Sequence, residues 1–186
     1  MGLDWIAEDN RILELEALRD SAEENLLICD PSSIDIAIRT REAADDALEG
    51  YRHQFVETAR AAKLQYTGPR PVFVTELLER TSYLQHEDKS FLDLLGWDNS
   101  FRAKLLLHHV VCKRKIDRVG IFFERKLDPA QAAQKAAQLA ALACSLEAEW
   151  RVLFRARAKR TVDTLCTASL WLWFWSERGC HILCSW

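Results

Sequence analysis

The sequence predicts an all-α protein, an elongated helical bundle or helical hairpin with coiled-coil-like seams. Only six glycines and four prolines interrupt its 186 residues. The long stretches between them are rich in Ala, Leu, Glu, Arg and Lys, which lose little entropy in a helix. Apolar residues also recur at three- and four-residue spacings, as on the buried face of a helix. Helix is therefore the expected state of most of the chain, in one domain with or without a helical arm.

Helix-breaking signals divide the chain at four places. The segment Asp30-Pro31-Ser32-Ser33 ends a first helix, expected from about Asp4 to Cys29, and caps a second, expected from Ile34 to Gln65. Thr67-Gly68-Pro69-Arg70-Pro71 cannot continue that second helix and marks a hinge. The other two breaks lie at 96–100 and 128–129. Before the first of them we expect a short helix after Val72, with a short strand over 72–75 as the alternative, and between the two a helix from about Phe101 to Leu127. Asp128 and Pro129 begin a last helix that continues past Arg160.

Charge is distributed unevenly along the chain. Residues 1–64 carry 15 Asp and Glu against 7 Lys and Arg, a net charge of −8, whereas residues 65–186 carry 13 against 18, a net charge of +5. We therefore expect three parts: an acidic helical hairpin at 1–66, a basic helical region packing on it at 67–164, and a Trp/Cys-rich tail at 165–186.

The six cysteines are expected to be free thiols. They stand at positions 29, 112, 144, 166, 180 and 184, and the first residues have neither the basic nor the apolar region of a secretory signal. A reducing compartment, cytoplasmic or nuclear, is the expected location of this protein. No lipid-attachment motif is expected either, because position 6 is Ile and Cys184 is third from the end.

The sequence contains no motif that specifies a reaction. The glycines are too scattered for a phosphate-binding loop, and neither G-x-S-x-G nor H-E-x-x-H occurs. Three sets of residues could hold a metal but fit ordinary packing better: Glu49 with His53, His108 with Cys112, and Cys180-His181-Ile182-Leu183-Cys184 with Cys166. We expect no metal and no cofactor, identify no small-molecule substrate, and regard an enzyme as the least supported class.

Two apolar segments are candidates for contact surfaces. Leu139, Leu142, Leu146, Trp150 and Leu153 follow a near-heptad spacing for only about two heptads, which favours a helical-hairpin seam over a long coiled coil. The segment Leu165–Trp175 holds three of the seven tryptophans and is too short to span a bilayer. It fits packing in a core or against a partner, contact with a membrane surface beside the basic residues before it, or a tail that selection has not shaped.

These patterns favour a non-enzymatic interaction protein, a scaffold or complex subunit that binds a protein partner or a second copy of itself. The predicted partner-binding residues are Leu146, Trp150, Leu153, Trp171, Trp173 and Trp175. One alternative is a peripheral membrane protein that uses the Trp-rich tail. The other is a nucleic-acid-binding module on basic helices 101–126 and 151–160, in which phosphates would be bound by Lys113, Arg114, Lys115, Arg118, Arg151, Arg155 and Lys159.

Overall fold

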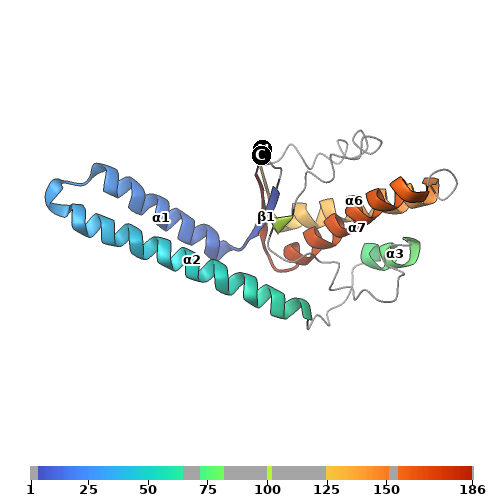
Figure 1. The fold of residues 1–186 in the computed structure, drawn as a ribbon, viewed down its shortest axis with the longest axis horizontal. Helices are drawn as coiled ribbons and strands as arrows, with labels where there is room; N and C mark the ends of the chain where they lie inside the picture. The colour runs from blue at the N-terminus through green and yellow to red at the C-terminus, as the bar shows by residue number, and fades with distance from the viewer. Residues whose placement is uncertain (1–3, 65–71, 82–99, 102–124, 151–154, 186) are drawn as a thin grey trace.

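A computed structural model describes residues 4–64, 72–81, 100–101, 125–150 and 155–185. Most of these residues are helical, so the all-α expectation is confirmed at the level of the class, but a small sheet accompanies the helices. A long hairpin of two helices projects from one side of the sheet, and the other helices lie on its opposite side (Figure 1). The elements are β1 (Asp4–Glu8), α1 (Asn10–Ile28), the 3-10 turn η1 (Pro31–Ser33), α2 (Ile34–Leu64), α3 (Val72–Arg80), β2 (Ser100–Phe101), β3 (Lys126–Leu127), α6 (Pro129–Trp150), α7 (Arg155–Ser176) and β4 (His181–Ser185).

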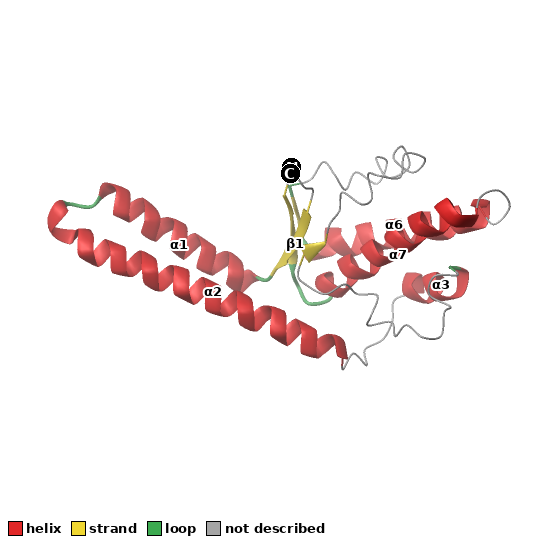
Figure 2. Cartoon of the chain, viewed as in Figure 1, coloured by secondary structure: helices red, strands yellow, loops and turns green. Residues whose placement is uncertain are grey.

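The four-stranded antiparallel sheet joins the two ends of the chain. Its strand order is β2-β1-β4-β3, so the first and last strands are neighbours, with Trp5 opposite Cys184 and Ala7 opposite Ile182 (Figure 2). The prediction of a helix from Asp4 is therefore wrong for residues 4–8, and α1 begins at Asn10. β1 is a strand because it pairs with a segment near the other end of the chain, which no local pattern in the sequence reveals.

One face of this sheet is covered by the α6–α7 helix pair. Trp5 stacks on Phe101 with 5.4 Å between ring centroids, and its ring centroid lies 6.3 Å from that of Trp171 on α7. Strand side chains alternate between the two faces of a sheet, so every second residue of β1 enters this core. The buried residues on the covered face are Trp5, Ala7, Phe101, Leu127, Ile182 and Cys184.

Helices α6 and α7 lie side by side and form the largest packed unit of the protein (Figure 1). The predicted start of α6 is confirmed, because Asp128 Oδ1 accepts a hydrogen bond from the Gln131 amide while Gln131 Oε1 accepts one from the Asp128 amide. Small side chains allow a close approach, and Ser169 Oγ on α7 donates to the Ala136 carbonyl at 2.7 Å. The alanines buried in this unit are Ala132, Ala136, Ala140, Ala143 and Ala168.

The Trp-rich segment is an internal part of the fold. The separate tail predicted at 165–186 is wrong in this respect, because residues up to Ser176 belong to α7 and residues from His181 belong to β4. Gly179, with φ of 71°, ends the helix: the Gly179 amide bonds the Ser176 carbonyl and the Cys180 amide bonds the Trp175 carbonyl. This turn directs the chain into β4, and Trp171, Trp173 and Trp175 are all buried in the core.

Several other predicted helices agree with the structure only in part. The helices expected at Ile34 and Val72 are confirmed. The helix expected over 101–127 is wrong at both described ends, since Phe101 belongs to β2 and Lys126–Leu127 to β3, and its interior lies outside the described residues. The single helix expected past Arg160 is two helices, of which α6 ends at Trp150. Among the described residues, no helix is long and apolar enough to cross a membrane.

If Trp171 belongs to the core, truncating it must destabilise the whole fold. We expect Trp171→Ala to lower the free energy of unfolding by about 3–5 kcal/mol, the usual cost of removing a fully buried aromatic side chain. Leu18→Ala, at an exposed position of α1, is the control and should change it by less than about 0.5 kcal/mol. Urea titration monitored by circular dichroism measures the free energy of unfolding of both variants. Equal midpoints for Trp171→Ala and the wild type would contradict the placement of this residue.

Candidate interaction arm and its base

The helical hairpin that projects from the sheet, which we call the arm (residues 10–64), is only partly packed. Its inner end has a small core of Ile12, Leu15 and Leu48, supported by Tyr51 and Phe55. Beyond this core, Ala22 is the only buried residue between positions 20 and 47. We call residues 20–49 the tip; its last turn, with Leu48, reaches back to the small core. Two helices that share so little buried surface gain little free energy from each other there.

Large apolar side chains face solvent at the tip. Leu27 and Ile28 at the end of α1 are 82% and 81% exposed, and three isoleucines at the start of α2 are exposed as well. Single exposed apolar residues are common on proteins, whereas an exposed apolar patch marks a contact surface. The exposed apolar residues of the tip are Leu27, Ile28, Ile34, Ile36 and Ile38, which are five of the seven exposed large hydrophobic residues in the described part of the chain. Two of them, Ile28 and Ile36, line one hollow.

A hollow lies between the two helices at the tip. Its volume is about 460 Å³, and residues of both helices and of the connection between them line it. Ile28 and Ile36 are its large apolar residues, whereas small side chains leave the space open. The remaining lining residues include Ala22, Cys29, Ser33, Ala37 and Thr40. Such a hollow is suited to receive an apolar side chain from another molecule.

The tip is also strongly acidic. It carries nine Asp and Glu against two Arg, a net charge of −7. Arg41 pairs with Asp45 at 3.5 Å, and Arg19, just outside the tip, pairs with Asp20 at 2.6 Å. Within the described arm, the other acids form no ion pair. They are Glu23, Glu24, Asp30, Asp35, Glu42, Asp46 and Glu49, all of them exposed.

At the other end of the arm, Asp9 fastens both helices to the sheet. It directly follows β1, and its Oδ1 accepts a hydrogen bond from the Ile12 amide at 2.9 Å, which caps α1. Its Oδ2 accepts a hydrogen bond from the Tyr51 hydroxyl of α2 at 2.8 Å. This bond, together with a smaller effect of burial, raises the pKa of Tyr51. One carboxylate thus fixes the positions of β1, α1 and α2 relative to each other.

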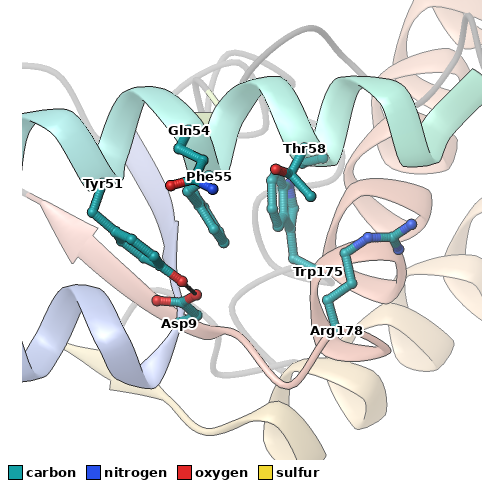
Figure 3. A pocket seen from close by; sticks show the side chains of 8 residues that line it. Asp9, Tyr51, Gln54, Phe55, Thr58, Trp175 and Arg178 are labelled. Atoms are coloured by element: carbon teal, nitrogen blue, oxygen red, sulfur yellow. Dashed lines mark hydrogen bonds between the residues drawn. The ribbon is translucent and has the colours of Figure 1, made fainter.

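A pocket of about 400 Å³ lies beside this joint (Figure 3). Tyr51, Phe55 and Trp175 supply its aromatic wall, and the Phe55 and Trp175 ring centroids are 5.3 Å apart. Arg178 stands at its edge, with the guanidinium carbon 3.5 Å from the Phe174 ring centroid and Nη1 donating to the Phe174 carbonyl at 2.9 Å. Asp9 bonds residues of the arm and Arg178 bonds Phe174 of α7, so the arm is joined to α7 here by the Phe55–Trp175 ring pair.

A second polar contact at the base involves a buried acid. Glu8 of β1 is 3% exposed, and Arg52 of α2 bonds both Glu8, at 3.5 Å, and Glu16 of α1. Burial raises the pKa of Glu8, the neighbouring Glu16 raises it further, and Arg52 opposes both effects. Among the described residues, Glu8 Oε2 has no hydrogen-bond partner. Arg52 therefore links three elements around one acid that is costly to ionise.

The described thiols are arranged for packing. Burial raises the pKa of Cys180 to about 12 and raises that of Cys166 as well, which suppresses the reactive thiolate. The described cysteines, Cys29, Cys144, Cys166, Cys180 and Cys184, are free. Among the described residues, no group of three or more His, Cys, Asp or Glu side chains is placed to hold a metal ion. His108 and Cys112 lie outside the described residues.

The structure separates the predicted site residues. Leu146, Trp171, Trp173 and Trp175 lie together in the core, where a partner does not reach them. Trp150 ends α6 without a described side chain, and Leu153 lies outside the described residues. Arg155 and Lys159 lie on α7, again without described side chains, and the other predicted phosphate-binding residues, Lys113, Arg114, Lys115, Arg118 and Arg151, are outside the described part.

Sequence reasoning missed the tip. The four-residue spacing of Ile34 and Ile38 predicts that both lie on the buried side of α2, yet both are exposed. The missed signal was the additional Ile36, because residues 34, 36 and 38 cannot all lie on one face of a helix. No protein-family model, curated protein or solved structure matches this chain.

The joint at Asp9 can be tested by a double-mutant cycle. We expect Asp9→Ala to lower the free energy of unfolding by about 1–3 kcal/mol, because the cap and the Tyr51 bond are both lost. Tyr51→Phe removes only the second bond and should cost about 0.5–1.5 kcal/mol. The double variant should lose less than the two effects added together, since one bond is shared. Strictly additive effects in urea unfolding would show that the two side chains do not interact.

The buried Glu8 predicts a pH dependence of stability. A raised pKa in the folded state means that the stability contributed by protonated Glu8 is lost as the pH rises through that pKa, above its ordinary value of 4.5. Glu8→Gln cannot ionise, so we expect its free energy of unfolding, relative to the wild type, to increase between pH 4 and pH 7. Urea unfolding at several pH values measures this difference, with the exposed Glu14→Gln as the charge control. A difference that falls with pH would contradict this assignment.

Proposed function

We propose that this protein is a non-enzymatic interaction protein, a scaffold or complex subunit, that binds a protein partner through the tip of its helical arm. The observation that carries this proposal is the exposure of five large apolar side chains at the tip, far from the core. Figure 1 shows that the connection between α1 and α2 lies at the end of the arm farthest from the sheet.

The energetics favour a binding role. Burying one Leu or Ile side chain contributes about 1.5–3 kcal/mol. Five such residues together can offset the cost of association, which is about 4–15 kcal/mol. Within the tip itself, Ala22 is the only buried residue besides Leu48, so the apolar residues do not contribute an equivalent amount to folding. A partner that covers the tip would bury the apolar side chains that the protein's own fold leaves exposed.

The base of the arm supports the same role. Asp9 and Arg52 tie α1 and α2 to the sheet, and Phe55 packs on Trp175 of the core. A contact surface on an element held in this way needs less ordering when it binds. The arm is therefore suited to present its tip at a defined distance from the body of the protein.

Paired capture experiments test this proposal. The tip variant Ile28→Ser with Ile36→Ser alters two exposed residues that line the hollow, and Leu18→Ser is the control at an exposed site of α1 outside the tip. We expect quantitative mass spectrometry to find proteins that the wild type and the control capture but the tip variant loses at least tenfold, since tenfold corresponds to about 1.4 kcal/mol. The loss must recur with purified components.

Both variants should keep the wild-type free energy of unfolding within about 0.5 kcal/mol, because the replaced residues are exposed. If the tip variant captures the same proteins in the same amounts as the wild type, the tip is not the contact surface and the proposal fails.

A further inference from the structure

The tip combines two features that together restrict the partner. Five large apolar residues are exposed there, and seven acids in the same segment have no ion pair within the described arm. Asp35 is the immediate neighbour of both Ile34 and Ile36, and Asp30 lines the same hollow as Ile28. An apolar side chain that enters this hollow therefore brings its own neighbours close to carboxylates.

From this juxtaposition we infer that the tip docks an amphipathic helix of a partner protein that carries Lys or Arg beside its apolar face. This inference rests on the proposed function and adds the chemistry of the partner. A helix fits because the hollow runs between two helices, a groove into which the apolar ridge of a third helix can pack. Basic residues fit because Asp30 lines the hollow and Asp35 lies between Ile34 and Ile36 in the sequence.

Charge also argues against the other occupants. Two copies of the tip each carry a net charge of −7, and those charges that approach within a Debye length, about 8 Å at physiological salt, would repel. A nucleic acid would be repelled for the same reason, because its phosphates are also negative. An acidic helix would add repulsion and a neutral one would gain nothing from Asp30 and Asp35, so a basic helix is the occupant that satisfies both features.

A pair of designed peptides tests the inference on the full chain. One is an 18-residue amphipathic helix of Leu and Lys, and the other has Glu in place of every Lys. We expect the Lys peptide to bind in fluorescence anisotropy and to bind at least tenfold more weakly at 300 mM than at 50 mM NaCl. The Glu peptide should not bind. Equal binding of the two peptides would overturn the inference.

Matched variants locate the binding. Asp30→Asn with Asp35→Asn removes two charges at the tip, and Glu14→Gln with Glu57→Gln removes two at the inner part of the arm. The first pair should weaken binding of the Lys peptide at least fivefold, and the second pair should weaken it less than twofold. The tip variant Ile28→Ser with Ile36→Ser should weaken binding of the same peptide at least tenfold. Equal effects of the two charge pairs would show only diffuse electrostatic attraction and would contradict the inference. Unchanged binding by the Ile variant would contradict it as well.

Failure here is distinguishable from failure of the proposed function. If paired capture finds a partner that depends on Ile28 and Ile36 but binds independently of salt and of Asp30 and Asp35, the arm is a contact surface and the basic helix is wrong. If analytical ultracentrifugation shows self-association that the Ile variant abolishes, the occupant is a second copy, and the inference is likewise overturned.

Discussion

The pairing of β1 with β4 is the contact on which the rest of the structure depends. It brings Trp5, near one end of the chain, against Trp171 and Phe101, so that the sheet and the α6–α7 pair share one core. Without it, β1 would be an isolated segment and one face of α7 would lose its cover. The same strand then ends in Glu8 and Asp9, whose bonds to Arg52 and Tyr51 orient the arm. A long-range strand pair thus determines where two otherwise independent helices point.

This arrangement divides the chain into a packed body and a sparsely packed arm. In the body, the tryptophans of α7 and the alanines of α6 bury surface on several elements at once. In the arm, Ile12, Leu15 and Leu48 form a small core near the sheet, and beyond it Ala22 is the only buried residue between positions 20 and 47. Stability is therefore concentrated at the base, while the apolar residues of the tip remain in water. Residues that do not stabilise their own fold are the ones available to bind another.

Much of the fold could be predicted wherever the determining signal was local. Pro31 and the serines after it end α1 and begin α2, and Asp128 caps α6 through its own neighbours. The strands could not be predicted this way, because Trp5 becomes a strand residue only opposite Cys184. For the Trp-rich segment the sequence leaves packing in a core, a membrane surface and an unselected tail as alternatives. Only the long-range contacts decide between them, because Trp171 packs against Trp5 of the sheet and Trp175 against Phe55 of α2. The exposed isoleucines of the tip could not be predicted either, since periodicity alone does not show which apolar stripe is buried.

The acids at the tip explain how such an exposed apolar surface can persist. Five accessible Leu and Ile side chains on a projecting element would favour self-association if they stood alone. Unpaired carboxylates among them, such as Asp35 between Ile34 and Ile36, make two like tips repel before their apolar residues meet. The same carboxylates attract a surface of opposite charge and leave the apolar contact available to it. In the proposed function, charge at the tip would select the partner, and the isoleucines would supply the affinity once that partner has arrived.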